Sequence, residues 1–264
     1  MFCSIIGHPL KKPRSVKLWK KFFKDKKFKI EMYPLDIKKK DFKRKIKCLI
    51  IDKNFLASAI TMPYKKEILK YIKIKDRISL YANSINLIVK EKNSLYGYNT
   101  DVYGALKSVQ NLNKKNIILF GFGGTGEAIY RTFKKIFPKA NFIIISSKKN
   151  LKLENRTILK KKIDEKDIRL TDLFINCSPL GSNLKKKFLD KSPLGVSHLK
   201  KMKKKSMVFD IVYSPKKTLL SRNCKKLKIK YVNGIKMNTM QASKALSIVE
   251  KEINNQKGRV ERAL

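Results

Sequence analysis

The sequence predicts an α/β protein in which a parallel sheet is covered by helices on both faces. Two observations predict this fold class. Short apolar segments with strand character alternate with amphipathic, lysine-rich segments of helical period along the chain. A glycine-rich turn at 121–126 joins one of these strands directly to a helix. At about 100–200 residues per domain, 264 residues suit one large domain or two small ones.

The first hundred residues predict strands at 4–7, 28–34 and 55–60, where short apolar runs end at polar or turn-forming residues. An apolar stripe that includes Val16, Trp19 and Phe23 predicts a helix over 15–24. Residues 38–48 form a basic amphipathic stretch, and 64–80 are expected to be helical. Residues 87–91 begin a hairpin whose turn we expect at Asn93-Ser94.

The pattern changes near Thr100. We expect helices over 101–111, 127–137 and 237–253, where apolar residues recur at helical spacing. Strands are expected at 116–121, 142–146, 172–177, 207–212 and 230–234. Because these strands are almost continuously apolar and alternate with helical segments, they predict the parallel sheet.

Composition excludes several classes of protein. The apolar fraction of 42% is enough for a core, so disorder is not expected. No run of about 18 apolar residues exists, and the N-terminus lacks a signal-peptide pattern. The four cysteines have no CxxC spacing and no nearby histidine pair. We therefore expect buried thiols in a reducing compartment, the cytoplasm, and no zinc site.

The formal net charge of +44 suggests a partner with many negative charges, such as a nucleic acid. However, arginine, which is preferred for bidentate phosphate and base contacts, supplies only nine of the 64 basic residues. The lysines are also spread along the whole chain, as the coding bias of an AT-rich genome would spread them. The charge is therefore read as a background that attracts nucleic acid non-specifically at low salt.

The turn Gly121-Phe-Gly123-Gly124-Thr125-Gly126 follows a predicted strand and opens a predicted helix. Gly121 would permit a tight turn, and Gly123 and Gly124 would let backbone N–H groups approach a pyrophosphate at the helix N-terminus. The spacing differs by one glycine from the usual GxGxxG. Taken alone, this turn is either a dinucleotide site or merely a tight strand–helix connection.

The end of the next predicted strand distinguishes NADP from NAD. An NAD site needs an acidic residue there for the ribose 2′-hydroxyl, whereas this chain has Ser146, Ser147, Lys148 and Lys149. Two cations and no acid favour the 2′-phosphate of NADP. The alternative is that Lys148 and Lys149 belong to the lysine excess found along the whole chain.

Three segments, at 61–66, 82–87 and 97–104, place polar residues where predicted strands end. In open α/β sheets this edge is where ligands bind, so Lys65, Asn86 and Asp101 are candidates to converge there. A single lysine is weak evidence in so basic a chain. The alternative role for Asp101 is an N-cap of the following helix.

Eight motifs then resemble the shikimate dehydrogenase family, in the family's order and over essentially the whole chain. GxNTDxxG is intact at 97–104, and DxxYxPxxTxLL is retained from Asp210 to Leu220. The other six are the opening GNPIxHSxSP at 7–16, NVTxPxK at 59–65, GAVNT at 83–87, the glycine-rich loop at 121–128, NATPxGM at 176–182 and NGxxMxxxQA at 233–242.

The resemblance implies two domains: an α/β substrate domain of residues 1–100 plus 237–264, and a Rossmann-type, doubly wound NADP domain of residues 101–236. It implies reversible NADPH-dependent reduction of 3-dehydroshikimate to shikimate, in chorismate and aromatic amino-acid biosynthesis. The expected assembly is a monomer or homodimer with no specific nucleic-acid partner and no membrane association.

The resemblance also implies roles for individual residues. Lys65 and Asp101 would be the catalytic pair, with Lys65 moving the proton and Asp101 orienting it and binding substrate hydroxyls. Ser15, Thr61, Asn86, Tyr213 and Gln241 would bind the substrate. The cofactor would contact Gly121, Gly123, Gly124, Thr125, Gly126, Ser147, Lys148, Lys149, Ile211 and Gly234. No role is assigned to His8 or His198.

The chain departs from the family pattern at several positions. Pro13 replaces the first of two carboxylate-binding serines and brings neither a hydroxyl nor an N–H. Ala57 and Ala59 replace a glycine and an asparagine, and Ser147 and Lys148 replace an Asn-Arg pair. One lost hydrogen bond to a charged group costs about 1.5–3 kcal/mol, so we expect activity with a raised KM for the substrate.

Two alternatives stay open. The chain could belong to the branch of the family that also oxidises quinate, often with NAD. It could instead be a basic nucleic-acid-binding protein on a degraded enzyme scaffold.

Overall fold

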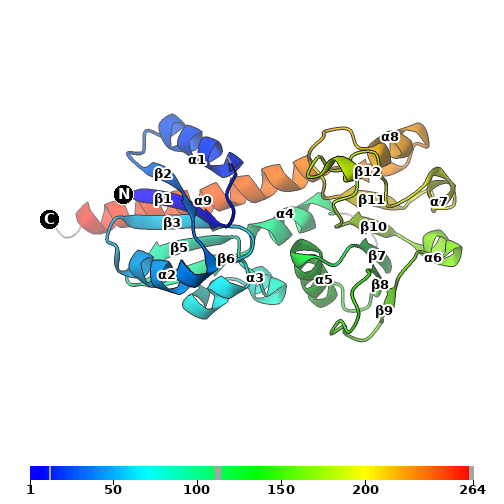
Figure 1. The fold of residues 1–264 in the computed structure, drawn as a ribbon, viewed down its shortest axis with the longest axis horizontal. Helices are drawn as coiled ribbons and strands as arrows, with labels where there is room; N and C mark the ends of the chain where they lie inside the picture. The colour runs from blue at the N-terminus through cyan, green and yellow to red at the C-terminus, as the bar shows by residue number, and fades with distance from the viewer. Residues whose placement is uncertain (12, 111–113, 262–264) are drawn as a thin grey trace. The chain divides into compact units, whose positions relative to one another are not determined.

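The structure is a computed structural model that describes residues 1–11, 13–110 and 114–261. Its residues divide into two compact units. The first unit consists of 1–100 and 241–264, and the second of 101–240. Each unit is built on a six-stranded sheet (Figure 1). The assignment of substrate to the first unit and of NADP to the second stays a prediction.

The sheet of the first unit has the strand order β2-β1-β3-β5-β6-β4. β3–β5 and β5–β6 pair antiparallel, and the other neighbours pair parallel. Its strands are β1 (Phe2–Gly7), β2 (Glu31–Asp36), β3 (Phe55–Ile60), β4 (Lys73–Ile74), β5 (Leu87–Glu91) and β6 (Ser94–Tyr98). Its helices are α1 (Arg14–Asp25), α2 (Phe42–Ile51) and α3 (Arg77–Ala82), with short 3-10 turns η1 (Lys39–Asp41) and η2 (Glu67–Tyr71).

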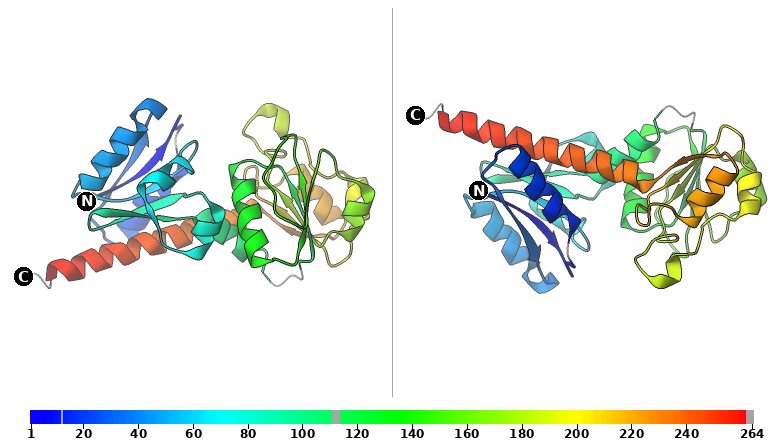
Figure 2. Two further views of the ribbon diagram at one scale, coloured as in Figure 1. Left: turned by 90° about the horizontal axis from the view of Figure 1, so that it is seen from below. Right: turned by 90° about the horizontal axis from the view of Figure 1, so that it is seen from above.

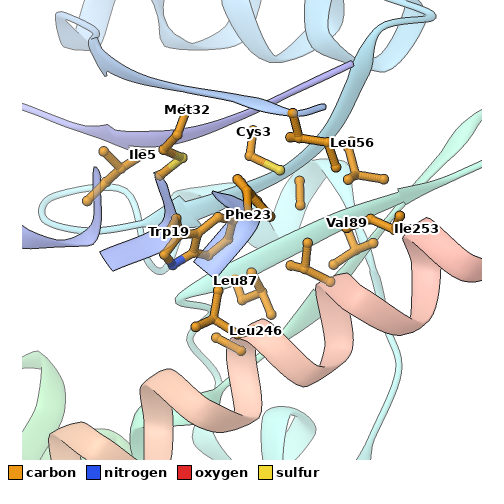
Figure 3. Packing of buried hydrophobic residues seen from close by; sticks show 14 residues of the cluster. Cys3, Ile5, Trp19, Phe23, Met32, Leu56, Leu87, Val89, Leu246 and Ile253 are labelled. Atoms are coloured by element: carbon orange, nitrogen blue, oxygen red, sulfur yellow. The ribbon is translucent and has the colours of Figure 1, made fainter. Parts of the chain in front are cut away.

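Alternation along the strands gives this sheet two apolar faces. Ile5 joins a cluster with Trp19 and Phe23 of α1 and with Leu246 and Val249 of α9 (Gly234–Glu261). Figure 3 shows Trp19, Phe23 and Leu246 of this cluster together beside the strands. Ile6, the next residue along β1, joins a second cluster with Phe42, Ile46 and Leu49 of α2. The sheet is therefore covered by α1 and α9 on one face and by α2 on the other.

The sheet of the second unit has the order β12-β11-β10-β7-β8-β9, and all of its strand pairs are parallel. Its strands are β7 (Asn116–Phe120), β8 (Asn141–Ile145), β9 (Thr157–Lys160), β10 (Leu173–Asn176), β11 (Met207–Asp210) and β12 (Lys230–Val232). Its other elements are α4 (Thr100–Ser108), which begins at the last residue of the first unit, α5 (Gly124–Ile136), α6 (Glu165–Leu170), η3 (Lys186–Phe188), α7 (Val196–Lys200) and α8 (Leu219–Lys226).

The order of this sheet is that of a doubly wound fold, because the chain builds outwards from β7 in both directions. One face carries a cluster of Ile118, Phe174 and Val208 with Leu199 of α7 and Leu220 of α8. Figure 2 shows α5 (green) on one face of the sheet and α8 (orange) on the other. The predicted α/β fold class with a parallel sheet covered on both faces is confirmed.

The prediction of a single helix over 64–80 is wrong. Residues 67–71 form η2, Lys73 and Ile74 pair with Tyr96 and Gly97 as strand β4, and α3 begins only at Arg77. The new start has a local cause. The Asp76 carboxylate accepts hydrogen bonds from the backbone N–H of Ser79 at 2.9 Å and from its hydroxyl at 2.8 Å, which caps α3.

Smaller differences concern boundaries. β2 spans Glu31–Asp36 rather than 28–34, and the β5–β6 turn lies at Lys92-Asn93, where Lys92 has a φ of 54°. Residue 111, the end of the helix predicted over 101–111, lies outside the described residues. The cysteines are free, but Cys48 is exposed on α2 and Cys177 is half-buried, so the expectation of four buried thiols holds only for Cys3 and Cys224.

Candidate functional site

Polar side chains of the first unit gather at one edge of its sheet because of how the strands run. Strands β1 and β3 end there, and β5 begins there because it pairs antiparallel with β3. The backbone ties these ends together. Thr61 N–H donates to Ile6 C=O at 2.9 Å, and Ile60 N–H donates to Asn86 C=O at 2.8 Å. The Lys65 carbonyl accepts from Ile85 N–H at 2.7 Å, which joins the segment of Lys65 to that of Asn86.

Asn86 and Gln241 meet through the Thr100 hydroxyl. Asn86 Nδ2 donates to Thr100 Oγ1 at 2.9 Å, and Thr100 Oγ1 lies 3.1 Å from Gln241 Oε1. The Asn86 side chain also accepts from Thr100 N–H at 2.7 Å. The structure thus brings together two of the predicted substrate residues, which are far apart in sequence. Thr100 was not among the predicted site residues, although it lies within the intact GxNTDxxG motif.

A second network beside it holds the preceding residue. Buried Asn99 donates from Nδ2 to the Ser84 carbonyl at 2.7 Å and to its hydroxyl at 3.0 Å. Its backbone N–H donates to Ser79 Oγ at 2.6 Å. The ends of β6 and α3 are fixed to one another by these bonds.

The other predicted residues of this edge lie on its connecting segments. Thr61 follows β3, half-buried Lys65 lies four residues further on, and Ser15 is the second residue of α1. Pro13 is the N-cap residue of α1 and makes no side-chain capping bond. The serine that Pro13 replaces would have offered a hydroxyl for this cap, so the replacement also removes a capping group from α1. Asp101 is not an N-cap, because α4 begins at Thr100 and Asp101 lies within its first turn.

The loop after β1 is held by a pair of side chains, His8 and Asp36, to which the sequence assigned no role. His8 Nδ1 lies 2.6 Å from Asp36 Oδ1, and Leu10 N–H donates to Asp36 Oδ2 at 3.0 Å. The hydrogen bond from His8 is the main cause that lowers the pKa of Asp36 below its ordinary value. His8 N–H also donates to Met62 C=O at 3.1 Å, so this loop is attached to the segment that follows β3.

In the second unit, the glycine-rich turn has the geometry that a dinucleotide needs. Gly121 has a φ of +94°, and a Cβ there would lie 2.8 Å from the Ser178 nitrogen. A Cβ at Gly126 would overlap the carbonyl oxygen of Gly121, so glycine is required for close packing of α5 on the turn. At Gly123 and Gly124 a Cβ would meet nothing within 4 Å, which leaves open space before the N-terminus of α5.

The remaining predicted cofactor residues lie at the carboxyl ends of the same sheet. Ser147, Lys148 and Lys149 are exposed directly after β8, and Lys148 N–H donates to Ser146 Oγ at 3.1 Å. Ile211 follows β11, as does the predicted substrate residue Tyr213, which is exposed. Gly234 opens α9, where a Cβ would overlap the Ile211 carbonyl. Thr125 lies in the first turn of α5.

Within the described ranges, no group of three or more His, Cys, Asp or Glu side chains could hold a metal ion. None of the helices in the described part of the chain is long and apolar enough to cross a membrane.

Comparison with known proteins identifies the family. The family model described as the shikimate dehydrogenase substrate binding domain matches residues 5–88. A shikimate dehydrogenase (NADP(+)) of Clostridium botulinum (strain Loch Maree / Type A3) is 32% identical over 197 residues, which are 72% of this chain and 73% of that protein. The enzyme of the same name from Methanococcus vannielii is 29% identical over 266 residues, covering 92% of this chain and 89% of the relative.

Solved structures agree on the fold. The chain is similar, with a TM-score of 0.76 and 24% identity, to a shikimate dehydrogenase crystallised in complex with NADP+; the match covers 94% of this chain and 89% of that one. Together with the motifs and the two sheets described above, these likenesses identify the family. The chain belongs to the shikimate dehydrogenase family.

Proposed function

We propose that this chain is an NADP-dependent shikimate dehydrogenase, which reversibly reduces 3-dehydroshikimate to shikimate with NADPH. Membership of the family supports the reaction. The observation that carries the proposal within the structure is the polar edge of the first sheet. There the side chains of Asn86, Thr100 and Gln241 are hydrogen-bonded together beside the segment of Lys65. A ring that bears hydroxyls and a carboxylate needs several such groups, because unpaired polar atoms penalise the wrong substrate.

The residues of the second unit fit NADP. The open space at Gly123 and Gly124 leaves room for a pyrophosphate at the N-terminus of α5, where backbone N–H groups are unsatisfied by the helix. Ser147, Lys148 and Lys149 would bind the ribose 2′-phosphate, and the absence of an acid at 146–149 favours NADP over NAD. When bound, NADPH supplies the hydride.

In the proposed mechanism the protein moves one proton. Lys65 donates it to the substrate carbonyl oxygen as the alcohol forms, and accepts it in the reverse direction. Asp101 orients the Lys65 ammonium group and binds substrate hydroxyls. Ser15, Thr61 and Tyr213 hold the carboxylate and ring, while Asn86 and Gln241 bind hydroxyls. The loss of a serine at Pro13 predicts a raised KM for shikimate.

Replacement of Lys65 tests this mechanism against a neighbouring control. Lys65→Ala should lower kcat by about 10²–10⁴-fold, because the proton donor is lost, while far-UV circular dichroism stays unchanged. Lys66→Ala removes the adjacent exposed lysine and should keep kcat within about twofold. The measurement is NADP reduction with saturating shikimate. Unchanged kcat in Lys65→Ala would refute the role of Lys65, and no turnover by the unaltered chain would refute the proposed function.

The same assay separates the alternatives. Quinate in place of shikimate and NAD in place of NADP test the broader branch of the family. We propose no specific nucleic-acid partner, since the lysines are spread over both units. Binding to DNA that disappears steeply with added salt would agree with this, and sequence-dependent binding at physiological salt would contradict it. A monomer or homodimer in the cytoplasm is proposed, and the four unpaired cysteines support a reducing compartment.

A further inference from the structure

One buried carboxylate has no part in the mechanism proposed above. Asp210 is the last residue of β11 and is completely buried. Burial raises the pKa of Asp210, and the hydrogen bonds that it accepts oppose this rise. A buried acid costs free energy unless it is fully hydrogen-bonded, so its presence at this edge calls for a structural reason.

Asp210 accepts four hydrogen bonds, two on each oxygen. Oδ1 accepts from Asn176 Nδ2 at 2.9 Å and from Val212 N–H at 3.1 Å. Oδ2 accepts from Thr218 Oγ1 at 3.2 Å and from Tyr231 OH at 3.1 Å. The donors lie at the end of β10, in the segment after β11, at the N-cap of α8 and on β12. One carboxylate therefore fastens four separate segments of the second unit.

The Oδ1 side of this network leads directly to proposed cofactor residues. Ile211 lies between Asp210 and Val212, and its N–H donates to Asn176 C=O at 3.1 Å. Val212 C=O accepts from Gly234 N–H at 3.2 Å. The backbone on both sides of Ile211 is thus fixed to β10, to the Asp210 carboxylate and to the first residue of α9.

Asn176 extends the network to the glycine-rich turn. Its Oδ1 accepts from Ser178 N–H at 3.0 Å and from Ser178 Oγ at 2.7 Å. The Ser178 nitrogen in turn lies 2.8 Å from the place of a Cβ on Gly121. The orientation of the Asn176 amide is set by Asp210, because only the Nδ2 group can donate to a carboxylate.

We propose that Asp210 is a positioning residue for the dehydrogenase site. Its carboxylate holds the backbone of Ile211 to Tyr213, and through Asn176 the turn at Gly121, in the places where Ile211 and the turn would contact NADP and Tyr213 would contact the substrate. The inference rests on the proposed function. Asp210 touches neither ligand and acts only through these neighbours.

Two substitutions at Asp210 test the proposal in graded fashion. Asp210→Ala removes all four bonds, including the one to the backbone N–H of Val212, which cannot rotate away. Asp210→Asn keeps an oxygen for Val212 N–H and Asn176 Nδ2, while its NH₂ group faces the Thr218 and Tyr231 hydroxyls, which can rotate to accept. We expect kcat/KM for NADP to fall about 10–100-fold in Asp210→Ala and less than about tenfold in Asp210→Asn.

The isotope effect separates positioning from mere loss of stability. With shikimate deuterated at the carbon that is oxidised, Asp210→Ala should show a larger isotope effect on kcat than the unaltered chain, because misplacement slows the hydride-transfer step itself. The full-length protein is assayed at a temperature where circular dichroism shows it folded. If Asp210→Ala does not fold, the same measurements are made on Asp210→Asn. In this variant KM for NADP and the isotope effect should both exceed those of the unaltered chain, but by less than is expected for Asp210→Ala.

Ser206→Ala is the matched control at the opposite end of the same strand. Buried Ser206 directly precedes β11 and donates from Oγ to Thr171 C=O at 2.6 Å. This variant should lose stability but keep the kinetic constants and the isotope effect of the unaltered chain. Kinetic constants and isotope effects that stay unchanged in both Asp210 variants would overturn the positioning role. If the unaltered chain shows no turnover, the proposed function itself fails.

Discussion

Both units present polar groups at one edge of a six-stranded sheet, but they hold them with different chemistry. In the first unit the network around Asn86 and Asn99 consists of neutral amides and hydroxyls, in the pairs Asn86–Thr100, Thr100–Gln241 and Asn99–Ser84. In the second unit the centre of the network is the Asp210 carboxylate. A carboxylate only accepts, so it dictates the direction of every donor around it, whereas amides and hydroxyls can exchange donor and acceptor roles.

The two sheets also differ in the direction of their strands. The first sheet is mixed and brings β5 back antiparallel, so that both the end of β3 and the start of β5 lie at the polar edge. The second is entirely parallel, so its edge consists of the carboxyl ends of neighbouring strands. This difference supports the proposal that the first unit binds the hydroxyls of a ring, whereas the second keeps backbone groups fixed for the cofactor.

The largest loss of stability in the second unit is expected where an added methyl group would overlap backbone atoms. Gly126→Ala would place a Cβ against the Gly121 carbonyl, and we expect it to lower the free energy of unfolding by about 3 kcal/mol. Gly124→Ala is the control, since its Cβ meets nothing within 4 Å. It should leave stability unchanged or slightly raised, while NADP binds more weakly. Urea unfolding and NADP titration measure both effects; equal losses of stability in the two variants would contradict the packing argument.

The next largest effect should come from the neutral network of the first unit. Asn99→Ala leaves the buried Ser84 carbonyl without its donor, which costs about 1–3 kcal/mol of unfolding free energy. Trp19 is the only tryptophan in the sequence and lies in the core of the first unit, so its fluorescence reports the unfolding of that unit. Asn93→Ala in the exposed hairpin turn should shift this transition by less than about 0.5 kcal/mol. A fluorescence transition that is the same for Asn99→Ala and Asn93→Ala would contradict the role of the Asn99 side chain.

The smallest effect concerns the pair of His8 and Asp36 at the edge of the first sheet. The pKa of Asp36 is lowered in the folded state, so its ionised form favours folding. This contribution is present above a pH of about 4, the value for an unfolded aspartate, and is lost as the pH falls through the lowered pKa. Asp36→Asn should therefore be less stable than the unaltered chain at pH 7, and the difference should shrink in acid. Urea midpoints between pH 3 and 7 measure it, and a difference independent of pH would show that ionisation of Asp36 contributes nothing.

The sequence predicted the second sheet better than the segments around it. Strands at 116–121, 142–146, 172–177 and 207–212 were recognisable because central parallel strands are apolar on both faces, as the fully buried strands β10 and β11 are. Strand β9 was missed because it lies at the edge of the sheet and is only partly buried. The prediction of a helix over 64–80 failed because the spacing of apolar residues reveals neither the cap at Asp76 nor the pairing of Lys73 with Tyr96.

The site shows the same limit. Motifs supplied the positions of Asn86, Gln241 and the glycines, because family resemblance acts residue by residue. They did not reveal that Thr100 joins Asn86 to Gln241, since that contact spans 141 positions in sequence. Nor did they reveal the four donors of Asp210. Long-range hydrogen bonds of this kind depend on the packed fold and leave no periodic signal in the chain.

The unequal burial of the cysteines makes the chain convenient to label. Burial raises the pKa of Cys3 and of Cys224 to about 12 and also raises that of Cys177, so these thiols stay protonated at neutral pH. Cys48 is exposed on α2, whereas Phe42, Ile46 and Leu49 of the same helix are buried. A maleimide dye would therefore attach at one place, in the first unit, without any cysteine having to be removed.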